Sequence, residues 1–297
     1  MAGVLVTTKW LTEHLDDPSV VVVDLRWREG PPGRGRDQYR AGHIPGAHYL
    51  DWSTDLVDPQ SPVAFMLAPP ERFAAVMHGC GIGDDATVVA YADGRGNGPF
   101  RLWWACRVYG HDDVRVLDGG FDKWVAEERP VSTEPPVRRQ PRAPWTPRHA
   151  PRPVARPRDV LAGRTDPGLV VLDSRPSEQF EGRAVWFEAG QIPADREGIA
   201  QTPRGEIRAG HVPWARNIPW SALYREDHTM KSPEELRALF EAVGASPATR
   251  VITYCGCGIS ASALLFAAMR AGIEDATLYD ASWEEWGRDP LLPVART

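Results

Sequence analysis

The chain contains an internal repeat. Four segments of the first half recur, in the same order, in the second half. The pairs are VVVDLR with VVLDSR, YRAGHIPGAHYLDW with IRAGHVPWARNIPW, VVAYADG with VITYCGC, and VLDGGFDKW with LYDASWEEW. Because the period is far longer than that of a solenoid, the repeat indicates duplication of a whole domain. The length of 297 residues agrees with this reading, since about 150 residues is an ordinary domain size.

The two copies differ in length at one place. The first pair of segments begins at Val21 and Val170, an offset of 149 residues, and the second pair begins at Tyr39 and Ile207, an offset of 168. The second copy therefore carries 19 extra residues between these two landmarks.

Hydrophobic patterning predicts the fold class of each copy. Short β-branched runs such as VVVDL, TVVAY, LVVLD and RVITY have the length of buried strands, and they alternate with helical patterns such as PEELRALFEAVG. This alternation predicts an α/β domain with a parallel sheet in each half. We expect an N-terminal domain over residues 1–133, a linker over 134–154 and a C-terminal domain over 155–297. Nine prolines between Pro130 and Pro157 indicate that the linker is extended.

Composition excludes several classes of protein. A net charge of −6 provides no basic field for nucleic acid, and no apolar run approaches the roughly 20 residues that span a membrane. The N-terminus lacks the layout of a secretion signal, so we expect a cytoplasmic protein. The four cysteines are too scattered for a disulfide framework and show no zinc spacing with histidine. Free thiols, no metal and no cofactor are expected.

The segment YCGCGIS is the strongest candidate for chemistry. Cys255 follows the predicted strand VITY, and ligands of α/β folds gather at the carboxyl ends of parallel strands. The loop Gly256, Cys257, Gly258, Ile259, Ser260 can curve tightly and lead into a helix that starts near Ser260, so its N–H groups can form an anion-binding nest. Such a nest lowers the pKa of a thiol. A merely structural cysteine would leave the glycines unexplained.

Together these motifs resemble the tandem-domain sulfurtransferases, the family of thiosulfate sulfurtransferase (rhodanese) and 3-mercaptopyruvate sulfurtransferase. The resemblance covers nearly the whole chain. It implies two rhodanese-like, three-layer α/β/α domains, each with a central and mostly parallel sheet, of which only the C-terminal one is catalytic. In agreement, Ala92 and Asp93 of the first copy stand where the second copy has Cys255 and Gly256.

The resemblance also implies a reaction. Cys255 would take a sulfane sulfur from a small anionic donor, forming a persulfide, and pass it to cyanide, a thiol or a thioredoxin-like protein. The loop contains no lysine or arginine, which favours 3-mercaptopyruvate over the thiosulfate dianion. Cys257 replaces the serine that is typical of mercaptopyruvate enzymes. It could donate a weak hydrogen bond, attack the persulfide, or only line the loop.

Three positions bear on donor binding in the family. Arg204 lies seven residues before the histidine of GHVP, as a family arginine does, and is expected to bind the donor's anionic group. Gln179 occupies the place of a second family arginine, a departure from the pattern. Arg183, four residues further on, could compensate, or it could be an ordinary exposed arginine.

Three further residues are candidates for supporting roles. Asp173 and Arg175, at the end of VVLDSR, could support the loop or form an internal ion pair. His43 matches a family histidine that helps to protonate the leaving group. His211 holds the equivalent place in the second copy, which indicates a structural turn instead.

Other classes of function stay open at this point. A phosphatase would need an arginine at the loop's end, where Ala261 and Ser262 stand. A non-enzymatic sulfur-relay or binding module is compatible with the missing family arginine. A dithiol oxidoreductase would use Cys255 and Cys257, but neighbours separated by one residue close a disulfide only with strain.

Overall fold

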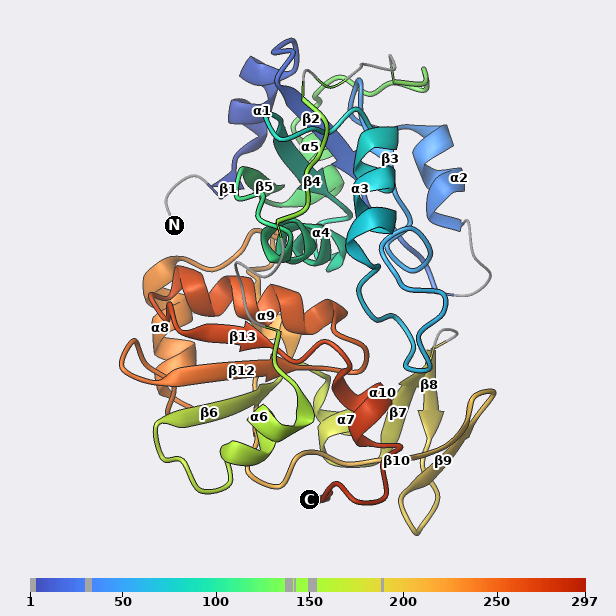
Figure 1. The fold of residues 1–297 in the computed structure, drawn as a ribbon. Helices are drawn as coiled ribbons and strands as arrows, with labels where there is room; N and C mark the ends of the chain where they lie inside the picture. Colours follow the sequence, from blue (N-terminus) through green and yellow to red (C-terminus); the bar gives the residue numbers. More distant parts are fainter. Residues whose placement is uncertain (1–3, 30–33, 137–140, 142, 149–153, 188–189) are drawn as a thin grey trace. The chain divides into compact units, whose positions relative to one another are not determined.

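The computed structural model describes residues 4–29, 34–136, 141, 143–148, 154–187 and 190–297 (Figure 1). It divides into two compact units. Unit 1 comprises Met1–Pro59, Leu67–Pro153 and Tyr224–Met230, and unit 2 comprises Gln60–Met66, Val154–Leu223 and Lys231–Thr297. Each unit thus includes one short segment from the other half of the chain, which the repeat does not reveal. The predicted division at 133 and 155 stays a prediction.

Unit 1 is built on a parallel sheet with the strand order β1-β5-β4-β2-β3. Its strands are β1 (Leu5–Val6), β2 (Val20–Asp24), β3 (His48–Tyr49), β4 (Thr87–Tyr91) and β5 (Val114–Leu117). The helices are α1 (Thr8–His14), α2 (Arg34–Ala41), α3 (Pro70–Gly79), α4 (Gly98–Val108) and α5 (Gly120–Ala126). Leu11 of α1 and Trp124 of α5 pack against the valines of β2 and β4, while α4 contacts β4 and β5.

Unit 2 repeats this plan with the strand order β11-β6-β12-β13, again parallel. Its strands are β6 (Leu169–Asp173), β11 (Arg216–Asn217), β12 (Arg250–Tyr254) and β13 (Ala276–Leu278). One face carries α6 (Pro157–Ala162), α7 (Ser177–Phe180) and α10 (Ser282–Trp286). Thr253 of β12 donates to Ala261 O, which places α9 (Ile259–Arg270) on the other face, beside α8 (Pro233–Glu241) and the 3-10 turn η1 (Trp220–Leu223).

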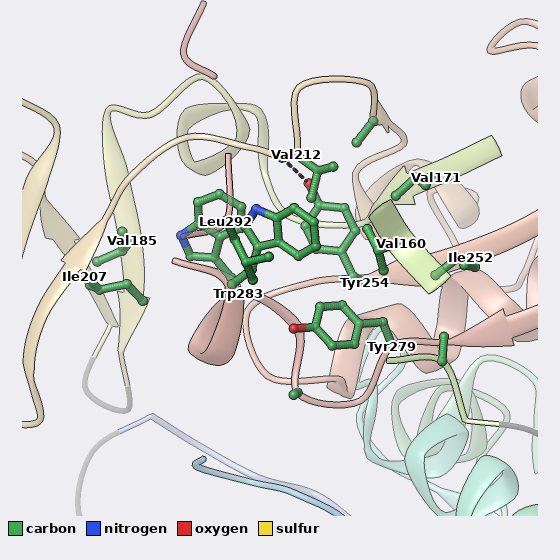
Figure 2. Packing of buried hydrophobic residues seen from close by; sticks show 14 of the residues in the cluster. Val160, Val171, Val185, Ile207, Val212, Ile252, Tyr254, Tyr279, Trp283 and Leu292 are labelled. Carbon is green, nitrogen blue, oxygen red and sulfur yellow. Dashed lines mark hydrogen bonds between the residues drawn. The ribbon is translucent and has the colours of Figure 1, made fainter. Parts of the chain in front are cut away.

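Aromatic side chains fill the core of unit 2 (Figure 2). Tyr254, Tyr279, Trp283 and Trp286 are each at most 2% exposed. Burial of one such side chain contributes about 1.5–3 kcal/mol. The Tyr254 hydroxyl also accepts a hydrogen bond from Val212 N–H at 3.2 Å, drawn dashed in Figure 2. The core therefore holds the end of β12, where Cys255 begins the loop.

The extra length of the second copy forms two β-hairpins. The first pairs β7 (Ala184–Phe187) with β8 (Gly190–Pro193), and the second pairs β9 (Ile199–Thr202) with β10 (Gly205–Arg208). The hairpins lie side by side in Figure 1, and β9 contacts both β7 and β8. In unit 1 the stretch between the same two landmarks contains helix α2 instead.

The linker predicted over residues 134–154 is described only in part. Residues 134–136, 141, 143–148 and 154 contain no helix or strand, while residues 137–140, 142 and 149–153 lie outside the described part of the chain. Trp145 is buried against Phe73 and His111 of unit 1. Within the described residues, no helix is long and apolar enough to cross a membrane.

Candidate active site

The two predicted supporting residues at the end of β6 form an internal ion pair. Arg175 Nε lies 3.0 Å from both carboxylate oxygens of Asp173, and its Nη2 donates to Asp173 at 2.6 Å and to Gly210 O at 2.7 Å. Both side chains are at most 2% exposed. Asp173 pairs in register with Tyr254, so the ion pair fixes the strand end beside the loop. Direct support of Cys255 by this pair stays a prediction.

The cysteine loop joins β12 to α9. It begins at Cys255, directly after β12, and Gly258 has a left-handed φ of 80°, which a residue with a side chain rarely adopts. Helix α9 starts at Ile259, one residue before the predicted position. Cys255 and Cys257 are 2% and 5% exposed, and both are free thiols. The loop therefore encloses its thiols rather than presenting them to solvent.

Hydrogen bonds to Cys255 lower its pKa by more than burial raises it. Burial raises the pKa of a thiol, but donors from the Cys257 and Ser260 side chains, and from the N–H groups of Ala261 and Cys257, lower the pKa of Cys255 to about 5. Cys80 shows the opposite outcome: burial, together with the negative charge of Asp55, raises its pKa to about 12. The loop thus holds Cys255 as a thiolate at neutral pH.

Ser174 supports the loop and was missed in the sequence. Its hydroxyl lies 2.9 Å from that of Ser260, which hydrogen-bonds to Cys255, and 3.4 Å from Tyr254 O. Ser174 is fully buried. The first copy has Leu25 at this place, so the leucine-to-serine difference between the repeats was the available signal.

Ser282 is a second missed residue. Its hydroxyl accepts from Cys255 N–H at 3.1 Å and donates to Tyr279 O at 2.8 Å. Its φ of 51° is left-handed, and the first copy has Gly120, with φ 58°, in the same place. A serine held in a conformation that favours glycine is a typical sign of local function. The signal was again a difference between the repeats.

Aromatic side chains cover the loop. A Cβ on Gly256 would lie 3.7 Å from the Trp186 ring, an ordinary contact distance. The Trp186 and Phe65 rings are 5.7 Å apart, and the Arg204 guanidinium lies 5.0 Å from the Phe65 ring and 5.5 Å from that of Phe187. The two hairpins and the segment Gln60–Met66 supply these residues, so the insertion found in the sequence forms part of the site.

Arg204, the predicted anion-binding residue, lies beside the rings of Phe65 and Phe187, which together with Trp186 we call the rim of the site. Its side chain is 35% exposed, and its Nη1 is 4.0 Å from Glu284 Oε2. The main-chain N–H of Glu284 in turn donates to Gly256 O at 3.0 Å. Glu284 therefore links the two: its main chain contacts the loop, and its carboxylate lies near Arg204.

The other predicted arginine lies elsewhere. Arg183 is 59% exposed and forms an ion pair with Glu181. Gln179, at the place of the second family arginine, is 3% exposed in α7. A role of Arg183 in substrate binding stays a prediction.

The two histidines of the repeated turn share a structural environment. His43 Nδ1 lies 2.8 Å from Tyr39 O and its Nε2 lies 3.0 Å from Glu134 O, and the ring stacks on Tyr39. His211 Nδ1 lies 2.7 Å from Phe180 O, and its ring stacks on Phe180. These contacts favour the structural reading, and a general-acid role of His43 stays a prediction. Among the described residues, no group of three or more metal-binding side chains is assembled.

Comparison with known proteins identifies the family. The rhodanese-like domain matches residues 7–127 and 157–289. The chain is 32% identical over 287 residues to 3-mercaptopyruvate sulfurtransferase of Escherichia coli (strain K12), covering 96% of this chain and 95% of that protein. It is 33% identical over 290 residues to thiosulfate sulfurtransferase of Bos taurus, covering 95% and 91%. The crystal structure of SseA from Escherichia coli, a 3-mercaptopyruvate sulfotransferase, matches with a TM-score of 0.77 and 31% identity over 94% of this chain and 98% of that one. The chain therefore belongs to the rhodanese family and is a tandem-domain sulfurtransferase.

Proposed function

We propose that Cys255 carries the transferred sulfur and that 3-mercaptopyruvate is the favoured donor. The observation that carries this proposal is the set of hydrogen bonds that lowers the pKa of a buried thiol to about 5. A thiolate is the nucleophilic form of cysteine. The donors that stabilise its charge also suit the terminal sulfur of a persulfide.

The reaction has two steps. The Cys255 thiolate attacks the sulfur of 3-mercaptopyruvate and the carbon–sulfur bond breaks. The electron pair of that bond stays on carbon, which takes up the donor's thiol proton, so that pyruvate is released and the outer sulfur is left as an anion. Cys255 then carries a persulfide. In the second step cyanide or a thiolate attacks the outer sulfur, the sulfur–sulfur bond breaks, and Cys255 returns to its thiolate form.

The choice of donor depends on charge near the loop. Cys255 to Ser260 contain no lysine or arginine, and Arg204 stands at the rim. 3-Mercaptopyruvate has one carboxylate, whereas thiosulfate is a dianion and favours a more cationic site. Similarity to relatives does not decide the donor, because identity to the mercaptopyruvate and thiosulfate enzymes is nearly the same.

Acceptors and location follow from the same chemistry. A small thiol, cyanide or the exposed thiol of a thioredoxin-like protein can attack a persulfide. Such thiol acceptors stay reduced in the cytoplasm, which is the location we propose.

A side-by-side steady-state assay with the two donors tests the proposal. We expect kcat/KM to favour 3-mercaptopyruvate, and Arg204→Ala to raise its KM about tenfold with a smaller loss of kcat, as loss of ground-state anion binding does. Arg250→Ala is the matched control, because Arg250 pairs with Asp166 at the opposite end of β12. A clear preference for thiosulfate would contradict the donor assignment.

Intact-mass measurement distinguishes the enzyme from the alternative, a non-enzymatic sulfur relay. Incubation with 3-mercaptopyruvate followed by intact-mass measurement should show a gain of one sulfur atom and release of pyruvate. A sulfur gain that occurs only from a persulfidated protein, without pyruvate release, would favour the relay.

A further inference from the structure

We infer that Glu284 sets the charge preference of the donor site, disfavouring dianionic donors relative to monoanionic ones. The inference rests on the proposed role of Arg204 as the anion-binding residue. It concerns a carboxylate to which neither the repeat nor the cysteine loop drew attention.

Glu284 places a buried negative charge beside the loop. The residue is 5% exposed, and its main-chain N–H donates to Gly256 O at 3.0 Å. This hydrogen bond fixes the backbone of Glu284 against the loop. Its Oε2 accepts from Arg288 Nε at 3.0 Å and lies 4.0 Å from Arg204 Nη1. Because the carboxylate is buried, water screens its charge poorly and any anion bound at Arg204 will sense it.

Arg288 holds the hairpin that carries Arg204. Its Nη1 lies 3.1–3.3 Å from three carbonyl oxygens of the β9–β10 hairpin, those of Arg204, Gly205 and Glu206, and its Nη2 donates to Thr202 Oγ1 at 3.2 Å. Glu284 therefore acts on Arg204 through its charge, while its hydrogen bond goes to the arginine that positions the turn.

The charges of this cluster favour a single negative charge on the donor. Glu284 Oε2 lies 3.0 Å from Arg288 Nε and 4.0 Å from Arg204 Nη1, so its negative charge opposes part of the attraction that the two arginines exert on an anion. A dianion such as thiosulfate is repelled by this charge more strongly than a carboxylate donor is. Since Coulomb energy is proportional to ligand charge, loss of the Glu284 charge should act about twice as strongly, in free energy, on a dianion as on a monoanion.

Glu284→Gln tests this effect, because the amide oxygen can still accept from Arg288 while the charge is lost. We expect kcat/KM to rise about threefold for 3-mercaptopyruvate and about tenfold for thiosulfate, the square of the first factor. Glu206→Gln is the matched control: it removes an exposed carboxylate of the same hairpin, whose charge water screens, and should change either value by less than twofold. Equal factors for the two donors in Glu284→Gln would overturn the inference.

A second measurement does not require turnover. Competitive inhibition of the wild-type protein and Glu284→Gln by acetate and by sulfate should show a larger gain for sulfate. If Glu284→Gln folds poorly, as judged by thermal unfolding, Glu284→Asp serves instead. Its shorter side chain moves the carboxylate away from Arg204, so we again expect a larger gain for sulfate than for acetate, with smaller factors. Equal gains for the two anions would contradict the inference.

The outcomes separate the inference from the proposed function. If Arg204→Ala leaves the KM of both donors unchanged, the proposed anion-binding role is wrong and the inference falls with it. If Arg204→Ala raises KM but Glu284→Gln shows no dependence on donor charge, only the inference is wrong.

Discussion

The two halves of the chain have the same framework and different loops. In each, an arginine two residues after an aspartate bonds the aspartate and a glycine carbonyl of the GH(I/V)P turn: Arg26 with Asp24 and Gly42, and Arg175 with Asp173 and Gly210. Tyr91 and Tyr254 accept from the turn at 3.2 Å, and Trp124 and Trp286 each donate to a proline carbonyl. The framework therefore does not by itself specify catalysis.

What differs is the segment between strand and helix. It runs over 255–258 in unit 2 and over 92–97 in unit 1. In unit 1 Ala92 stands at the position of Cys255, and the following Asp93 pairs with Arg28. The shorter loop brings the Ala261 N–H of α9 onto Cys255, whereas the longer one leads into α4 past the acidic side chain of Asp93.

The largest effect is expected at the nucleophile itself. Cys255→Ser should abolish sulfur transfer from either donor while leaving the fold intact, because a serine hydroxyl is neither ionised nor able to carry a sulfane sulfur. Steady-state assays and thermal unfolding measure the two effects. Cys80→Ala, which removes a thiol from unit 1, should retain activity, and turnover above a few per cent in Cys255→Ser would contradict the assignment.

A smaller effect is expected on pH dependence. The thiolate fraction of Cys255 decreases as the pH falls through its pKa of about 5, so kcat/KM should decline below that pH. Ser260→Ala removes one donor to the thiolate, which raises the pKa and moves this acid limb upward by about one to two units. Ser262→Ala, on the same helix but bonded to Ile259 O, should leave the limb in place. An unchanged acid limb in Ser260→Ala would show that this donor does not set the pKa of Cys255, and it would contradict the difference we draw between the loops of the two units.

Cys257→Ser should change activity only slightly. A hydroxyl donates a stronger hydrogen bond than a thiol, so activity with 3-mercaptopyruvate should be retained or improved. Mass spectrometry after a single turnover should show a persulfide on Cys255 and a free Cys257 in the wild-type protein. A Cys255–Cys257 disulfide would show that Cys257 resolves the persulfide instead.

The smallest effect is expected from a cysteine in unit 1. Ala92→Cys, made in the Cys255→Ser background, should restore no activity, since Gly94 stands where unit 2 has the Cys257 thiol, and the loop of unit 1 runs over 92–97 rather than over the four residues of 255–258. Burial should raise its pKa, since burial is the largest cause that raises the pKa of Cys80 and of Cys106. Persulfide formation on this cysteine would show that the framework, rather than the loop, activates the thiol.

Much of the site could be predicted because it follows from local chain features. The repeat, the strand before Cys255 and the glycines after it are contiguous in sequence, and they indicated the α/β fold and the thiolate loop. Ser174, Ser282 and Glu284 could not be placed in the same way. They make their contacts from 86, 27 and 28 residues away, and only packing of the strands and helices brings them there.

The sequence alone therefore indicated the family, through the resemblance of several ordered motifs. It also predicted the duplicated framework and the candidate nucleophile, because hydrophobic periodicity and loop composition act over a few residues. The tertiary structure decided which side chains surround that nucleophile. The inserted residues form two hairpins, which place Trp186 at the loop and Arg204 at the rim of the site. The physical reason is that the pKa of a buried thiol and the charge felt by a donor depend on distances of a few ångströms between residues that are remote in sequence.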